Sequence, residues 1–192
     1  MQRPKCVKCV EKGFTLVELI IVLVIIGIAA VIGMPALLNA IRRAETEGGV
    51  RQATVELRAA RLEAVKHSAT VYVEADFAKD QLVTWRENNL TAGLSADDEQ
   101  LRRMPLPAKL YFWGPGDAAA EGPDATFPAS TPVLTFLPDG SIDEEAALRF
   151  GDGRNYLEVR VAPRATARVT MLKYNGTDWL KQGENDKRWT WD

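Results

Sequence analysis

Cysteine and histidine are almost absent from this sequence of 192 residues, which contains two cysteines and one histidine. Cys6 and Cys9 both lie within the first 13 residues, so disulfide bonds cannot stabilise the part of the chain that follows. A structural zinc site needs about four Cys or His ligands, and one Cys-x-x-Cys pair with His67 does not supply them. The composition therefore excludes a disulfide-stabilised domain and a zinc-stabilised domain.

Motifs for catalysis and for cofactor binding are also missing. The sequence contains no glycine-rich phosphate loop, no His-x-x-x-His pair and no Gly-x-Ser-x-Gly motif. The carboxylates of Asp139, Asp143, Glu144 and Glu145 lie close together in sequence, but their spacing does not follow that of a calcium-binding EF-hand loop. We expect a solvated turn there, and we expect no enzyme activity, no cofactor and no metal site.

Charge is distributed unevenly along the chain. Residues 1–13 contain four basic residues and one acidic residue, and the remainder contains 20 basic and 25 acidic residues, a formal charge of −5. Leu19 to Ile41 is a run of 23 residues without a charge. At about 1.5 Å per helical residue, this run can span a hydrocarbon core of about 30 Å. The positive-inside rule places residues 1–13 in the cytoplasm and the C-terminal part of the chain on the other side of the membrane.

An ordinary secretory signal peptide is the alternative interpretation of this run. Such a peptide has an apolar core of about 7–15 residues followed by a small-x-small cleavage site. The run here is longer, and no such site directly follows an early core. Cleavage before the run, after Gly13, would instead leave a chain that begins at Phe14 and keeps its apolar segment.

Glu18 is an acidic residue at the start of an apolar helix. A carboxylate inside a membrane helix costs about 2.5–3.5 kcal/mol on insertion scales, so a partner is expected. The nearest basic residues, Lys12 and Arg42, do not lie one helical turn away. Cleavage after Gly13 would create an α-amine at Phe14, four residues before Glu18, on the same subunit or on a neighbour. The alternative is that Glu18 has no charged partner and that its carboxylate only extends to the membrane interface.

The segment Lys12-Gly13-Phe14-Thr15-Leu16-Val17-Glu18-Leu19 resembles the class III signal of type IV pilins and of the pseudopilins of type II secretion. The resemblance implies that a prepilin peptidase cleaves after Gly13, that Phe14 becomes N-methylated and that Glu18 directs assembly. Pro35 is similar to the proline that kinks the helix in many members of this family. Because proline removes a helical hydrogen bond and crowds the preceding turn, a kink is expected there.

The same resemblance implies the location and the partners of the chain. A single membrane helix would hold the subunit in the lipid bilayer of the inner membrane, with its C-terminal domain in the periplasm. An inner-membrane assembly platform would then move the subunit into a filament with other pilins or pseudopilins.

Apolar residues after the membrane segment recur with the period of a helix. Val50, Ala53, Leu57, Ala60 and Ala64 are three or four positions apart, which predicts one apolar stripe on a helix. Gly48-Gly49 precedes this stripe and either weakens the helix or relieves crowding around it.

Apolar residues after Ser68 recur with the period of a strand. Strands are expected at residues 70–74, 81–86, 109–113, 133–137, 148–150, 156–161 and 167–172. Residues 87–105 and 114–132 are expected to be loops, and residues 138–141 and 175–176 are expected to be turns. The fold class expected is α+β, with a long N-terminal helix followed by an antiparallel β-sheet domain of pilin type.

Four segments are expected along the chain. Residues 1–13 form a cleaved leader, and residues 14–41 form the transmembrane and assembly helix. Residues 42–68 form an amphipathic helix that packs on the sheet, and residues 69–192 form the periplasmic β domain. This order resembles the GspH/FimT branch of minor pseudopilins and pilins, in which a turn like Leu137-Pro138-Asp139-Gly140 occurs. Ala165-Thr166-Ala167-Arg168-Val169 departs from the Gly-Arg strand motif that is frequent in that branch.

These patterns predict a structural role, as a minor subunit of a type II secretion pseudopilus or of a type IV pilus. The alternative is a FimT-like pilin that binds DNA for uptake. Arg160, Arg164 and Arg168 would contact the DNA, provided that they share one exposed face. Pro163 and the acidic composition after residue 13 argue against this alternative.

A substitution at Gly13 tests the predicted cleavage position. Gly13→Ala should leave an uncleaved precursor that keeps residues 1–13, because the resemblance places the glycine directly before the cleaved bond. Intact-mass measurement of the membrane-extracted chain distinguishes the precursor from a product that begins at Phe14. A product of wild-type mass from the Gly13→Ala variant would show that cleavage occurs elsewhere.

Overall fold

The computed structural model describes residues 15–88, 93–112, 133–181 and 189. One helix, α1 (Leu16–His67), precedes eight strands. The chain divides into two compact units, Met1–Arg42 and Arg43–Asp192, and each is described by itself.

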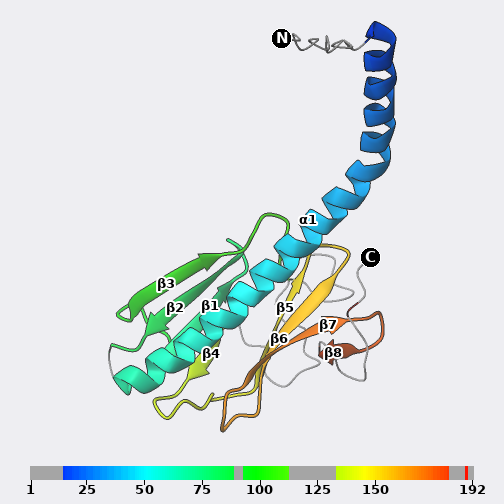
Figure 1. Ribbon diagram of the computed structural model, residues 1–192. Helices are drawn as coiled ribbons and strands as arrows, with labels where there is room; N and C mark the ends of the chain where they lie inside the picture. Colours follow the sequence, from blue (N-terminus) through cyan, green and yellow to red (C-terminus); the bar gives the residue numbers. More distant parts are fainter. Residues whose placement is uncertain (1–14, 89–92, 113–132, 182–188, 190–192) are drawn as a thin grey trace, which may run out of the picture. The chain divides into compact units, whose positions relative to one another are not determined.

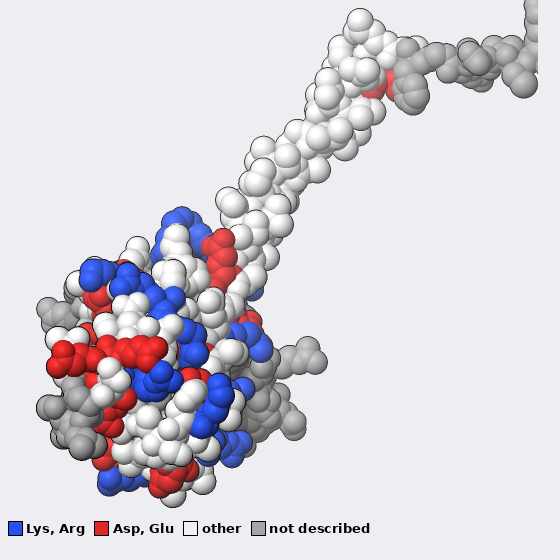
Figure 2. All heavy atoms as spheres, turned by 90° about the vertical axis from the view of Figure 1, so that its left-hand side faces the viewer, with Lys and Arg blue, Asp and Glu red and all other residues white. Residues whose placement is uncertain are grey.

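The first unit, in its described part, consists of the N-terminal half of α1. An apolar window of this helix meets the length and composition required to cross a membrane, and none of the window is buried. Figure 2 shows the helix almost without charged atoms, apart from acidic atoms near its N-terminal end. Pro35 lies inside α1, and the helix does not end there. The kink expected at Pro35 stays a prediction.

The second unit contains two antiparallel four-stranded sheets, with the strand orders β3-β2-β1-β4 and β5-β6-β7-β8 (Figure 1). The first sheet is formed by β1 (Val71–Asp76), β2 (Gln81–Arg86), β3 (Glu99–Pro105) and β4 (Val133–Phe136). The second is formed by β5 (Ala146–Gly151), β6 (Tyr156–Val161), β7 (Val169–Tyr174) and β8 (Trp179–Lys181). The predicted α+β class is confirmed, but the strands form two sheets where one was expected.

The C-terminal half of α1 packs against both sheets through one face. Its buried apolar residues are the predicted five, each with no exposed surface: Val50, Ala53, Leu57, Ala60 and Ala64. They belong to one core cluster with Val73 of β1, Phe136 of β4, Phe150 of β5 and Val159 of β6. Three of the five helix residues are alanines, and small side chains allow a helix to approach a sheet closely. The predicted apolar stripe is therefore confirmed, and it joins the two sheets through a common core.

The predicted turn at residues 138–141 connects β4 with β5 and contacts the helix. Gly140 has φ +82°, a conformation that glycine adopts at little cost. Its N–H donates to the Leu137 carbonyl oxygen at 2.9 Å, and its own carbonyl oxygen accepts a hydrogen bond from Arg61 Nε at 2.8 Å. A Cβ at this position would lie 2.9 Å from Val65 Cγ2, so the turn passes close to α1.

Two predictions for residues 87–113 are wrong. Residues 99–105, expected to be part of a loop, form the edge strand β3, in which Met104 is the one buried residue. Most of its side chains are exposed, so β3 lacks the apolar alternation that marks a half-buried strand. Residues 109–112 do not form the expected strand. Tyr111 makes only an isolated bridge to Gly151, and Leu110 and Phe112 are buried.

Other elements follow the predictions or lie outside the described residues. The strands at 81–86 and 156–161 have the predicted bounds, the strand predicted at 133–137 ends one residue earlier, and those near 70, 148 and 167 are shifted or extended by a few residues. Asn175-Gly176 lies in the connection between β7 and β8, and Trp179 is on β8. The expected loop at 114–132 and most of the tryptophan-containing tail lie outside the described residues.

Two leucines of α1 provide a matched test of this packing. Leu57→Ala should lower the free energy of unfolding by about 2–5 kcal/mol, because it leaves a cavity in the common core. Leu62→Ala should change it by no more than about 0.5 kcal/mol, because Leu62 is 68% exposed. Urea denaturation of the full-length chain in detergent measures the free energy of unfolding of both variants. Equal losses would contradict the assignment of the buried face.

Candidate functional site

The start of α1 fixes the position of Glu18. The Glu18 N–H donates to Thr15 Oγ1 at 3.2 Å, and the Leu19 N–H donates to the Thr15 carbonyl oxygen at 3.2 Å. Thr15 therefore caps the helix, and Glu18 lies in the first helical turn, three residues after the cap. A carboxylate is favourable in this turn because the unpaired N–H groups give the helix N-terminus a partial positive charge.

Glu18 has no charged partner in the part of the chain that the structure describes. Its side chain is exposed, and no basic group among the described residues forms an ion pair with it. Gly13 and Phe14, the predicted cleavage position and new N-terminus, lie outside the described residues. Pairing of the Phe14 amine with Glu18 thus stays a prediction.

The helix after Glu18 exposes apolar side chains on every face. Exposed fractions range from 45% at Val22 and Ile41 to 76% at Val31. A monomeric soluble protein rarely exposes a contiguous apolar patch larger than a few hundred Å². This surface therefore needs lipid or other apolar helices around it.

Within the second unit, α1 is bound to the strand connections near Thr46 and Gly49. Thr46 Oγ1 donates to Asp152 Oδ2 at 3.0 Å, although the residues are 106 positions apart. Gly49 packs against Pro107 and Leu110, and a Cβ on Gly49 would lie 2.6 Å from Leu110 Cδ2. Gly49 thus relieves crowding at a close contact, one of the two roles considered for the Gly48-Gly49 pair. A Cβ on Gly48 would meet no atom within 4 Å.

Polar side chains beside the buried stripe bind the helix to both sheets. Glu56 Oε1 accepts hydrogen bonds from Thr84 Oγ1 of β2 at 2.6 Å and from Arg102 Nε of β3 at 2.8 Å. On the other side, Arg58 donates to the carbonyl oxygen of Val169, the first residue of β7, at 3.3 Å. The periodicity of the helix in sequence gave no sign of these partners.

The arginines expected to contact DNA do not share one strand. β6 ends at Val161 and β7 begins at Val169, so Arg160 is on β6 while Arg164 and Arg168 lie in the connection between the strands. Arg160 binds Glu158 Oε1 at 2.6 Å, and Arg164 pairs with Asp143 at 3.0 Å. Of the three side chains, only that of Arg168 makes no hydrogen bond or ion pair among the described residues; its carbonyl oxygen accepts a hydrogen bond from the Ala162 N–H at 3.1 Å. The three arginines therefore do not lie along one strand, which is where Pro163 already argued against the DNA-binding alternative.

Metal binding finds no support in the described part of the chain. No group of three or more His, Cys, Asp or Glu residues is arranged there to hold a metal ion. Asp139, one of the carboxylates considered for calcium, accepts hydrogen bonds from the Ser141 N–H at 2.9 Å and from its hydroxyl at 2.5 Å. Both bonds hold the pKa of Asp139 below its usual value, and the bond from the Ser141 hydroxyl has the larger effect. This is expected for a carboxylate that stabilises a turn.

Two family models match this chain. Residues 9–34 match the model described as the prokaryotic N-terminal methylation motif, and residues 50–171 match the model described as type II transport protein GspH. The first match contains Gly13, Phe14 and Glu18, and the second begins at the first buried residue of the predicted stripe.

A curated relative and two solved structures are also similar. The type IV major fimbrial protein FimA of Dichelobacter nodosus is 36% identical over 85 residues, which are 44% of this chain and 49% of that protein. The chain thus spans about half the length of this relative. The type IV minor pilin FimU of Pseudomonas aeruginosa has a TM-score of 0.48 at 18% identity, over 68% of this chain and 90% of that one. The minor pseudopilin EpsH of the Vibrio cholerae type 2 secretion system has a TM-score of 0.44 at 15% identity, over 67% of this chain and 97% of that one.

The contact between Thr46 and Asp152 predicts a dependence of stability on pH. Burial alone would raise the pKa of Asp152, but hydrogen bonds from the N–H groups of Asn155 and Arg154 and from Thr46 hold it below its usual value. The ionised carboxylate therefore stabilises the fold above the unfolded-state pKa of about 3.9, and this stabilisation is lost as the pH falls through the lower folded-state pKa.

Thr46→Val should lower the free energy of unfolding by about 1–3 kcal/mol at pH 7, because it removes a donor to a charged acceptor. It should also reduce the loss of stability between about pH 4 and pH 2. Thr54→Val is the matched control, because the Thr54 hydroxyl donates to the uncharged Val50 carbonyl oxygen at 2.9 Å. Denaturation of the full-length chain at several pH values measures both variants. An unchanged acid dependence in Thr46→Val would contradict the prediction.

Proposed function

Because the chain belongs to the GspH family of type II transport proteins and carries the N-terminal methylation motif, we propose that it is a minor structural subunit of a periplasmic filament. The filament is a type II secretion pseudopilus or a type IV pilus. The subunit contributes packing surfaces to the filament and performs no catalysis.

The exposed apolar surface of α1 carries this proposal. The same side chains that lipid covers before assembly are covered by the helices of neighbouring subunits afterwards, since both surroundings are apolar. Transfer from the bilayer to the filament therefore exposes little apolar surface to water. Glu18 is the acidic residue that interrupts this surface, so it is the residue that gains most from a specific partner.

Processing supplies that partner. In the proposed sequence, prepilin peptidase removes residues 1–13, and the chain then begins with the amine of Phe14, which becomes N-methylated. A methylated secondary amine keeps its positive charge, so it can pair with a carboxylate. Thr15 holds Glu18 in the first helical turn, close to the new terminus. Pairing with the amine of an adjacent subunit compensates the cost of a carboxylate in an apolar environment and sets the axial stagger between the two helices.

The proposed location follows from the same segment. The helix crosses the inner membrane once, with residues 43–192 in the periplasm, because the basic residues precede the apolar run. The partners are the lipid bilayer, prepilin peptidase, an inner-membrane assembly platform and the other pilins or pseudopilins of the filament. DNA capture is not part of the proposal, because Arg160 and Arg164 are paired with carboxylates.

Removing the carboxylate of Glu18 tests the proposal. Glu18→Ala should leave membrane insertion intact, because it makes the helix more apolar, and should reduce co-purification with the other subunits at least about tenfold, as expected for loss of a partly buried ion pair. Glu45→Ala is the matched control, because Glu45 is an exposed glutamate of the same helix. The measurement is quantitative affinity purification of a tagged partner subunit from detergent-solubilised membranes. Equal recovery of Glu18→Ala and wild type would refute the role of Glu18.

A further inference from the structure

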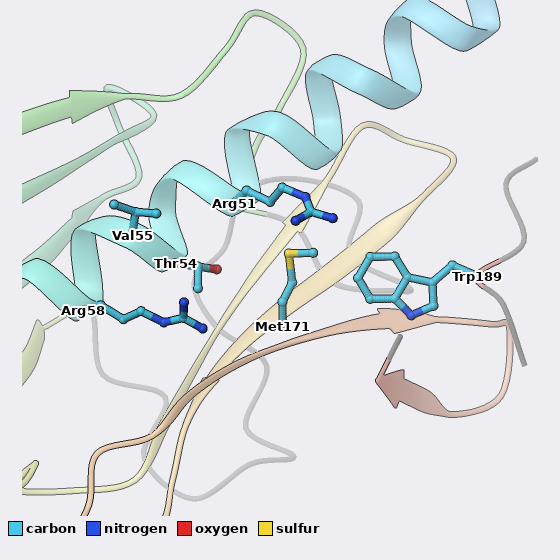
Figure 3. Close-up of a pocket in the computed structure, with 6 residues that line it drawn as sticks. All are labelled: Arg51, Thr54, Val55, Arg58, Met171 and Trp189. Atoms are coloured by element: carbon cyan, nitrogen blue, oxygen red, sulfur yellow. The ribbon is translucent and has the colours of Figure 1, made fainter. Parts of the chain in front are cut away.

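A groove runs along the exposed side of α1, between the helix and β7. One part is a cavity of about 250 Å³ whose lining includes Arg51, Val55, Arg58, Met171 and Trp189. Figure 3 shows Arg51 and Arg58 extending from α1 toward Met171, with the indole of Trp189 beside the methionine. The other part, of about 690 Å³, is lined by residues that include Arg58, Arg61, Leu62, Pro163 and Arg168. Arg58 lines both parts, and we call the two together the arginine groove.

Exposed apolar side chains occur at regular intervals along the arginine groove. Val55 is 61% exposed and Leu62 is 68% exposed, although both lie on the half of α1 that is packed into the second unit. Positions 51, 55, 58 and 62 are alternately four and three residues apart, so they form one line along the helix. Met171 and the Trp189 ring provide apolar surface on the opposite wall. This arrangement suits a partner with its own apolar stripe.

Three of the four arginines that line the groove form no ion pair with a carboxylate of the described residues, whereas Arg51 pairs with Glu47. The side chains of Arg58 and Arg61 donate to the backbone carbonyl oxygens of Val169 and Gly140, and the Arg168 side chain makes no hydrogen bond or ion pair among the described residues. Five arginines elsewhere in the described part of the chain are paired with carboxylates: Arg86, Arg102, Arg149, Arg160 and Arg164. In the groove, three arginines without a carboxylate partner lie together beside exposed leucine and valine, in a chain whose residues after 13 have a formal charge of −5.

We propose that the arginine groove docks an acidic amphipathic segment of another filament subunit. Apolar side chains of that segment cover Val55, Leu62 and Met171, and its carboxylates pair with Arg58, Arg61 and Arg168. An amphipathic helix that places one face in an apolar groove is a recurrent mode of peptide recognition. The inference rests on the proposed function, because a filament brings such a segment next to the groove.

The groove favours a protein segment over nucleic acid. Its walls are apolar, whereas binding to a nucleic-acid backbone depends on many phosphate contacts to a surface of basic residues.

A second copy of this chain fits the groove less well. Outside α1, its described and exposed carboxylates lie on turns and at an edge strand, as do Asp97, Glu99 and Glu144. Within the part of α1 that belongs to the second unit, Glu47 pairs with Arg51, Glu56 is bound to the sheet and Glu63 pairs with His67 and Arg86. This leaves Glu45 as a single exposed glutamate without an ion-pair partner among the described residues. The described part of the chain therefore offers no acidic amphipathic segment of its own, and the proposal is for a different subunit.

Site-specific photo-crosslinking in cells that produce the complete filament system tests this proposal. A benzoylphenylalanine at position 62 should crosslink to another subunit, and mass spectrometry should map the adduct to a segment with at least two acidic residues. The same group at position 79 is the matched control, because the Lys79 side chain is 71% exposed on a turn outside the groove.

Charge reversal identifies the cause of the contact. Arg168→Glu should reduce the adduct at position 62 at least about tenfold, because a carboxylate would then face the acidic segment. The Arg168 side chain is exposed and makes no bond among the described residues, so this variant should keep the wild-type melting temperature. Arg154→Glu, at an exposed arginine on the turn between β5 and β6, should leave the adduct unchanged.

Several outcomes would overturn the inference. These are an adduct that is insensitive to Arg168→Glu, an adduct that maps to a segment without acidic residues, or an adduct between two copies of this chain. Binding of a 30-base-pair DNA duplex by the full-length chain in detergent, lost in Arg168→Glu, would assign the groove to nucleic acid instead. Whether the wild-type chain is found in the filament fraction distinguishes failure of the proposed function from failure of this inference. Absence from the filament fraction contradicts the proposed function, whereas presence there without an adduct at position 62 contradicts only the arginine groove.

Discussion

The packing of one face of α1 against two separate sheets is the contact on which the folded unit depends. Val50, Leu57 and Ala64 lie on this face and reach strands of both sheets through the common core. In the described part of the chain, strand pairing occurs only within each sheet, apart from the isolated bridges Tyr111–Gly151 and Phe136–Ile142. The helix therefore does more than cover a sheet: its alanines and leucine supply the surface through which the two sheets become one domain.

The sequence allowed most of this fold to be predicted, because the buried elements have strong periodic signals. The stripe on α1 and the strands at 81–86 and 156–161 bury apolar residues with the periods of a helix and of a strand. The edge strand β3 was missed because hydrogen bonding to β2, rather than burial of its own side chains, forms it. Residues 109–113 were assigned to a strand because most of them are apolar. In the structure, Leu110 and Phe112 are buried, but they are not part of a ladder of strand hydrogen bonds.

The candidate site was predictable to a smaller extent. Glu18 stands out in sequence because it is charged within an apolar run, and the structure adds that Thr15 fixes it in the first turn. The roles of the arginines depend on partners distant in sequence, and periodicity holds no information about these. Arg160 is paired with a buried glutamate, whereas Arg168 lies beside Arg58 of the helix, 110 positions earlier in the chain. The groove that they line exists only once β7 has been placed next to α1.

The hydrogen bond between Thr46 and Asp152 also has a practical consequence for shortening the chain. The amphipathic pattern begins at Val50, which suggests that a truncated, water-soluble version could start there. Such a truncation would keep the whole apolar stripe, but it would delete both the donor to Asp152 and the glycine that packs against Pro107 and Leu110. The new end of the helix would then fray, because the deleted turn contains Thr46, whose hydroxyl binds the helix to the β5–β6 connection. The natural cut point is therefore Arg43, where the second compact unit begins.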